Sequence, residues 1–172
     1  SASIWYDSLR TPYIETTLEL AALCLRDARY RERGLAVAKA EIDRAFDKDS
    51  KGRLLLKEAW PVVSGEFPAE ERLLLVYADG LSRAGRSAEL RRFCEDAFES
   101  LQGASIMLNT RLAKEYFAAK EYAKMLRFVT ECFDRDRATD DMINHMRMAY
   151  IRANGSDAGY EDSLSAMRLR LR

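Results

Sequence analysis

The side chains that could do chemistry are few, and they do not converge on one segment. The single histidine, His145, has no second histidine or cysteine at a metal-binding spacing. Two carboxylate pairs, Glu70–Glu71 and Asp140–Asp141, each open a segment with helical periodicity, where acids suit the positive end of the helix dipole. The glycines stand singly rather than in a phosphate-binding loop. Because catalysis needs convergent reactive groups, we expect no enzymatic activity, no cofactor and no metal.

The cysteines give no sign of a redox or metal site. Cys24, Cys94 and Cys132 are widely spaced, none belongs to a CxxC pair, and their odd number leaves a free thiol in a monomer. Cys94 and Cys132 fall on apolar stripes, and free cysteine is among the residues most often buried. We therefore expect all three to pack as small apolar side chains.

The composition is that of a folded helical protein. Hydrophobic residues make up 48% of the 172 residues, enough for a packed core, and only three prolines and eight glycines interrupt the chain. No apolar run approaches the roughly 18 to 20 residues that span a bilayer, so we expect a soluble protein without membrane insertion. A start at Ser1 instead of methionine favours an expressed piece or a processed form of a longer protein. The compartment stays open, with the cytoplasm slightly favoured.

Apolar residues in the C-terminal part recur with the period of an amphipathic helix. From Ser87 to Leu101 they stand three and four residues apart along one face, which must be buried. The same pattern predicts further helices over residues 69–84, 108–119, 122–133, 142–153 and 160–171.

The first part of the chain is less regular. Thr11 is placed to cap a helix whose first residue is Pro12 and which runs to about Arg31, with Gly34 as the break after it. The remaining predicted segments are a helix over 35–46, a turn at 49–52 and a helix over 54–63 that Pro61 kinks or ends. We expect about nine helices in all.

Helix ends recur at a fixed interval. Gly85, Lys120 and Gly155 each end one helical pattern and precede another, and they stand 35 residues apart. An interval of this length is typical of stacked helix hairpins. The predicted organisation is one all-α domain over residues 1–172, with irregular capping helices at 1–34 and repeats over 35–172.

These segments resemble the tetratricopeptide-repeat family, whose unit is a helix pair with small residues where the helices cross. The family's first-helix pattern is matched by Leu74, Tyr77–Ala78, Leu81 and Gly85. The frequent tryptophan and closing proline of the family are missing, so the chain resembles a divergent member. The resemblance implies a right-handed α-solenoid of antiparallel helix hairpins with a concave face. A 35-residue spacing also suits pentatricopeptide repeats.

The family's groove positions, carried onto this chain, give a mixed basic and apolar surface. The resemblance implies a peptide groove lined by Arg72, Asp79, Arg83, Met107, Arg111, Lys114, Phe117, His145 and Arg152. The basic members would meet carboxylates of an acidic peptide. Met142 and Met146, with Ala149, would add apolar contacts, although methionine stripes at helical spacing also pack cores.

We therefore expect a non-catalytic module that binds a protein or peptide. The alternative is a structural or dimerisation part of a larger protein, which would self-associate. RNA binding, suggested by the spacing and by Arg168, Arg170 and Arg172, is disfavoured because 28 basic and 28 acidic residues give no concentrated positive field.

Overall fold

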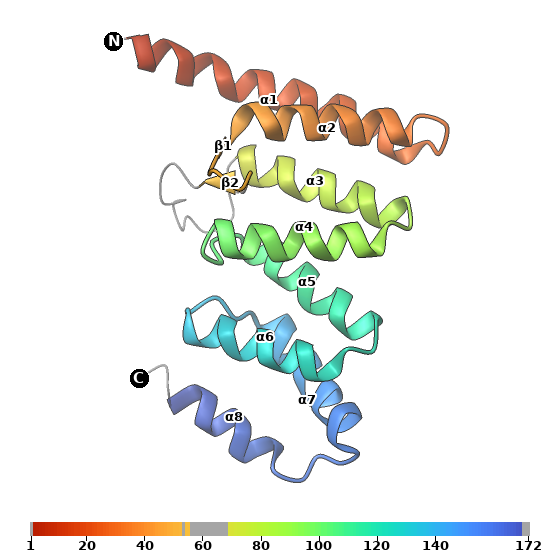
Figure 1. The fold of residues 1–172 in the computed structure, drawn as a ribbon, viewed down its shortest axis with the longest axis vertical. Helices are drawn as coiled ribbons and strands as arrows, with labels where there is room; N and C mark the ends of the chain where they lie inside the picture. The colour runs from red at the N-terminus through yellow and green to blue at the C-terminus, as the bar shows by residue number, and fades with distance from the viewer. Residues whose placement is uncertain (1, 53, 56–68, 170–172) are drawn as a thin grey trace. The chain divides into compact units, whose positions relative to one another are not determined.

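A computed structural model describes residues 2–52, 54–55 and 69–169 of the chain, and these form helices and one short hairpin (Figure 1). The elements are α1 (Ala2–Arg26), α2 (Arg31–Ala45), β1 (Asp47–Lys48), β2 (Leu54–Leu55), α3 (Ala69–Arg83), α4 (Ser87–Ser100), α5 (Ile106–Ala118), α6 (Tyr122–Asp134), α7 (Asp140–Asn154) and α8 (Tyr160–Leu169). The described residues therefore confirm an all-helical protein, with eight helices where the sequence predicts nine. None of these helices combines the length and apolar character needed to cross a membrane.

Contacts between Cα atoms divide the chain into two compact units, residues 1–96 and 97–172. Each unit has its own buried side chains and is described by itself below. The expectation of one domain over residues 1–172 stays a prediction.

The first unit is built on a stack of helices in which α1 contacts α2 and α3, and α2 contacts α3 (Figure 1). Apolar side chains at helical spacing turn inward from all three helices, as amphipathic helices require. They are Leu18, Ala21, Leu25, Leu35, Ala38, Ile42, Leu73, Leu74, Ala78 and Leu81.

Two glycines let these helices approach closely. Gly34 is buried inside α2, and a Cβ atom there would stand 3.0 Å from Cys24 Cβ and 3.1 Å from the carbonyl oxygen of Ala21 on α1. Gly80 on α3 faces Leu25 and Leu35 in the same way. The prediction that Gly34 breaks the chain between two helices is therefore wrong. The break lies at residues 27–30, and Gly34 is needed for helix packing instead.

Helix α1 also begins earlier than predicted. It runs without interruption from Ala2 to Arg26, so a helix start at Thr11 and Pro12 is wrong. An interior proline costs a helix about 3 kcal/mol, because it removes one backbone hydrogen bond and its ring clashes with the preceding turn. Pro12 lies inside α1 all the same, so a proline alone does not mark a helix start.

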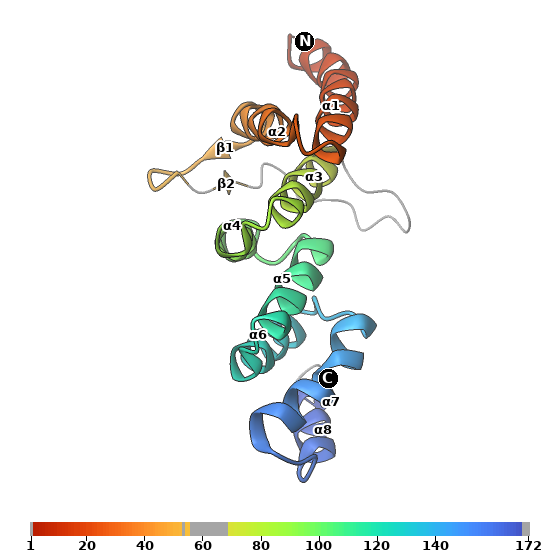
Figure 2. The ribbon, with the colours of Figure 1, turned by 90° about the vertical axis from the view of Figure 1, so that its right-hand side faces the viewer.

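The segment after α2 forms a β-hairpin, although the sequence predicts that a helix begins there (Figure 2). The predicted turn at 49–52 is confirmed: the Gly52 amide donates to the Asp49 carbonyl over 2.9 Å, with Gly52 at a φ of 76°. This turn brings β2 back antiparallel to β1. The predicted helix over 54–63 is therefore wrong at residues 54–55, and its remainder lies outside the described residues.

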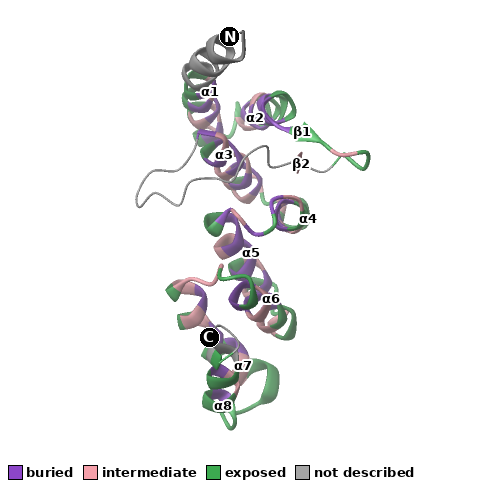
Figure 3. Ribbon diagram, turned by 90° about the vertical axis from the view of Figure 1, so that its left-hand side faces the viewer, coloured by how far each residue is buried: buried purple, intermediate pink, exposed green. Residues whose placement is uncertain are grey.

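The second unit has the same stacking pattern. Helix α5 contacts α6 and α7, and α6 contacts α7 and α8. Each of these helices has a buried and an exposed side (Figure 3). The buried apolar side chains include Phe98, Leu101, Leu108, Leu112, Tyr116, Met125, Phe128, Val129, Cys132, Phe133, Met142, Met146, Ala149, Tyr160 and Leu164.

Local signals set the ends of these helices. Ser105 and Thr139 cap α5 and α7, accepting hydrogen bonds over 3.3 Å from the amides of Leu108 and Met142. Three residues that follow helices, Gly85, Lys120 and Gly155, have the positive φ angles of 70°, 61° and 81°. This left-handed conformation ends a helix and lets the chain reverse.

Candidate functional site

The exposed sides of α5 and α7 carry most of the predicted groove residues. At steps of three or four residues, which place side chains on one side of a helix, α5 presents Met107, Arg111, Lys114 and Phe117, and α7 presents Asp141, His145, Met148 and Arg152. We call these eight residues the α5–α7 face. The two helices are in contact, and the side-chain interactions that link them include an ion pair, a hydrogen bond between threonines, a ring contact and a contact of an arginine with a ring.

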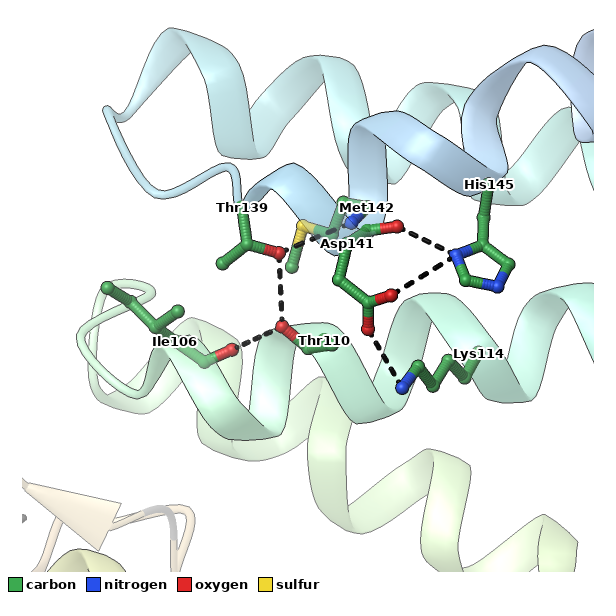
Figure 4. A network of polar contacts seen from close by, with 7 residues as sticks. All are labelled: Ile106, Thr110, Lys114, Thr139, Asp141, Met142 and His145. Atoms are coloured by element: carbon green, nitrogen blue, oxygen red, sulfur yellow. Dashed lines mark hydrogen bonds and ion pairs between the residues drawn. The ribbon is translucent and has the colours of Figure 1, made fainter.

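An ion pair joins the two helices at the centre of the face (Figure 4). Lys114 Nζ lies 2.8 Å from Asp141 Oδ2, and the hydrogen bond and charge of Lys114 lower the pKa of the Asp141 carboxyl. His145 stands on the other side of the same carboxylate, with Nδ1 3.4 Å from Oδ1. His145 Nδ1 also lies 2.7 Å from the Asp141 carbonyl oxygen, which can only accept, so this contact requires a proton on Nδ1.

Two threonines join α5 and α7 beside this ion pair (Figure 4). The hydroxyls of Thr110 and Thr139 lie 3.3 Å apart, and Thr110 also donates to the Ile106 carbonyl over 3.0 Å. Because Thr139 caps α7 as well, one side chain both starts that helix and holds it against α5. The position of Asp141 on the face follows from this start.

An aromatic cluster holds Arg152 at the far end of the face. Its Cζ atom lies 5.1 Å from the ring centroid of Phe117 and 5.5 Å from that of Tyr122 on α6. Its Nη1 donates to the Tyr122 hydroxyl over 2.8 Å. The Phe117 ring packs edge to face with Tyr122 at 5.4 Å and with His145 at 6.1 Å between centroids. The guanidinium is thus oriented by ring stacking and one hydrogen bond.

The three predicted groove residues on α3 belong to the first unit and each form an ion pair. Arg72 Nη2 lies 2.8 Å from Glu15 Oε1, and Arg83 Nε lies 2.7 Å from Asp79 Oδ2. These pairs are solvent-exposed, and the hydrogen bond to Asp79 raises the pKa of Arg83. A role for Arg72, Asp79 and Arg83 in binding stays a prediction.

Three residues predicted for the groove on α7 are buried instead. Met142, Met146 and Ala149 pack into the core of the second unit, so the prediction that these methionines contact a peptide is wrong. The N-caps Ser105 and Thr139 stand 34 residues apart, whereas the transfer from α5 to α7 used 35. One residue turns a helix by about 100°, enough to exchange an exposed stripe for a buried one.

The same one-residue shift places two further residues, Asp141 and Met148, on the α5–α7 face. Asp141 and Met148 stand 34 residues after Met107 and Lys114, and both are accessible. Asp141 is noticed in the sequence only as an acid in the first turn of a helix, which it is. Tyr122 gives no signal in the sequence, because its contact with Arg152 joins residues 30 positions apart.

The cysteines pack as expected, Cys94 and Cys132 fully and Cys24 in part. Burial raises the pKa of the Cys132 thiol to about 12. Within the described ranges, no three histidine, cysteine or acidic side chains gather in a metal-binding arrangement.

Comparisons with protein-family models, with curated proteins and with solved structures gave no match. The fold alone defines the class: over its described residues, the chain is a mostly helical protein in which neighbouring helices within each unit pack against one another.

Proposed function

We propose that the chain is a non-catalytic protein-interaction module, similar to tetratricopeptide repeats, that binds a peptide or protein through the α5–α7 face. The observation that carries the proposal is the packing pattern. In the first unit α1 contacts α2 and α3, and in the second unit α5 contacts α6 and α7 and α6 contacts α7 and α8. Contacts of a helix with the next helix and the one after it are how stacked hairpins bury their apolar sides. The residues that end three of the helices in the left-handed conformation, Gly85, Lys120 and Gly155, stand 35 residues apart, which supports a repeat of that length.

The chemistry of the α5–α7 face suits a peptide ligand. Met107 and Met148 are 43% and 48% exposed, and their flexible thioethers adapt to apolar side chains of different shapes. The Lys114–Asp141 pair is exposed, so it contributes at most about 1 kcal/mol and can exchange for contacts with a ligand. The face thus offers apolar contact area beside charges that remain available.

A test compares proteins captured from a lysate of the source cell by the parent chain and by a double variant, Met107→Glu with Lys114→Glu. Both changes lie on exposed side chains of α5, so the fold should be retained, as circular dichroism would check. A matched control is Ala123→Glu with Arg127→Glu, which changes the net charge equally on exposed residues of α6.

The proposal predicts a protein that the parent and the control capture and that the α5 variant loses. Capture that both variants lose equally would indicate a non-specific charge effect. Capture that neither variant changes would exclude the α5–α7 face as the binding surface.

Self-association is a second candidate function, favoured by one observation on α1. Leu20 and Leu23 are 52% and 63% exposed on the side of α1 opposite the buried Ala21 and Leu25. Exposed apolar residues that stand together often mark an interface between proteins. Sedimentation of the parent and of Leu20→Ser with Leu23→Ser over a range of concentrations tests this: association in the parent alone would support it, and a monomeric parent would exclude it.

A further inference from the structure

Arg152 is held by aromatic rings and a hydroxyl group, with no carboxylate of the described residues beside its charge. Several other arginines of the described residues instead form an ion pair with a carboxylate, among them Arg29, Arg44, Arg72, Arg83, Arg86, Arg135 and Arg147. Arg152 has no carboxylate partner within the described residues, and its contacts there are the rings of Phe117 and Tyr122 and the Tyr122 hydroxyl. Its charge is therefore held in place without being neutralised.

This arrangement prepares the guanidinium for a ligand. An arginine side chain loses rotamer freedom when a ligand fixes it, and here the rings and the hydroxyl supply that order before a ligand arrives. One N–H of Arg152 is used by Tyr122, which leaves others on an exposed side chain. The planar group can then bind an oxyanion through two parallel hydrogen bonds.

The local charge selects among oxyanions. Lys114 is balanced by Asp141, so Arg152 adds one unneutralised positive charge at its end of the α5–α7 face. A carboxylate carries a single negative charge and matches it, whereas a phosphate monoester carries about 1.5 to 2 at neutral pH. Met148 stands one turn before Arg152 on the same side of α7, which places an exposed apolar side chain beside the charge.

We propose that Arg152 is the receptor for one carboxylate of a bound peptide, an aspartate or glutamate side chain with an apolar residue next to it that contacts Met148. This inference rests on the proposed function and names the class of ligand for the α5–α7 face. Phe117 and Tyr122 act as positioning residues because they orient the guanidinium.

The test uses a displayed library of random short peptides selected on the whole chain. Affinities of the selected peptides are measured for the parent, for Arg152→Gln and for Arg152→Lys, each with the acidic peptide and with its Glu→Gln or Asp→Asn version. Arg127→Gln is the matched control, since Arg127 is exposed on α6 of the same unit. Circular dichroism verifies that each variant is folded.

Acidic peptides with a neighbouring apolar residue should be enriched. Arg152→Gln should weaken their binding about tenfold, as expected for a lost charge-assisted hydrogen bond of about 1.5 kcal/mol. The amide version of the peptide should bind the parent and Arg152→Gln equally, and Arg127→Gln should behave as the parent. Arg152→Lys should recover part of the affinity, because it keeps the charge but loses the planar fork.

The possible failures are distinguishable. If selected peptides bind but their affinity does not change in Arg152→Gln, the assignment to Arg152 is wrong while peptide binding stands. If a phosphoserine version binds far more tightly than the glutamate version and depends on Arg152, the single-carboxylate assignment is overturned. If no peptide binds the parent, the proposed peptide-binding function fails together with this inference.

Discussion

Replacing Gly34 by alanine tests the packing of α1 against α2. An ideal Cβ at this position would lie 3.0 Å from Leu25 Cγ, 3.0 Å from Cys24 Cβ and 3.1 Å from the Ala21 carbonyl oxygen. Ordinary contacts between carbon atoms are about 3.5 to 4.0 Å. Leu25 Cγ can move with its side chain, but Cys24 Cβ and the Ala21 carbonyl oxygen are fixed by the α1 backbone, so a rotamer change cannot remove them and the two helices must separate.

Two opposing effects set the size of the change. Alanine favours a helix interior over glycine by about 1 kcal/mol, which would stabilise α2. Inserting a methyl group into a packed core costs about 1 to 3 kcal/mol. Because the obstructing atoms are fixed, we expect the cost to exceed the gain and Gly34→Ala to lower the free energy of unfolding by on the order of 1 kcal/mol.

Urea unfolding followed by circular dichroism measures this difference as a lower midpoint with an unchanged slope. Ala36→Gly provides a control in the same helix: Ala36 is exposed, so it should lose only the propensity of about 1 kcal/mol. If Gly34→Ala were as stable as the parent or more so, the close approach of α1 to Gly34 would be refuted.

Three further predictions concern single side chains of the second unit. Lys114→Gln should raise the pKa of Asp141 in a carboxyl NMR titration, and an unchanged pKa would contradict the ion pair. Because Lys114 lowers that pKa in the folded state, the ion pair stabilises the fold at pH values above the ordinary pKa of the carboxyl group. This stabilisation is lost as the pH falls through the lowered pKa. Asn109→Ala should lower the free energy of unfolding by about 1 to 3 kcal/mol in a urea titration, since the buried Asn109 Nδ2 donates to the Gly103 carbonyl over 2.9 Å; a change near zero would mean that this bond is absent. At neutral pH a thiol reagent should label the partly exposed Cys24 well before Cys132, because burial raises the pKa of the Cys132 thiol to about 12. Mass spectrometry measures the two labelling rates, and equal rates would show that Cys132 is accessible.

The helices from residue 69 onward were predictable because their signals are local. The apolar stripe from Ser87 and the acids Glu70 and Asp140 at helix starts need only neighbouring residues to act, and the helices form where these signals stand. A 3.6-residue stripe that is continuous over four turns leaves little room for another structure.

The errors arose where one residue type serves two structural purposes. Gly34 was interpreted as a helix break, but a glycine also allows two helices to approach, and only the neighbouring helix decides between these roles. Pro12 was interpreted as a helix start, although it lies within α1. On α7, Met146 was placed in the groove by counting 35 residues from its equivalent on α5. The N-caps of the two helices stand 34 residues apart, and Met146 packs into the core.

The candidate site was predictable only in part. The sequence identified Lys114, Phe117, His145 and Arg152 through the family resemblance, and the structure brings them together along α5 and α7. It could not show that Tyr122 orients Arg152, because that contact depends on the packing of α6 against α7.

Hydrogen–deuterium exchange of the whole chain, with and without a peptide selected on it by display, tests the central claim most directly. Our account predicts slower exchange along α5 and α7 when the peptide is bound, with exchange along α1 unchanged. At a peptide concentration near the parent's Kd, Arg152→Gln should show much less of this protection, because its binding is about tenfold weaker. Protection confined to α1, or none in α5 and α7 under conditions where the peptide is bound, would contradict binding through the α5–α7 face.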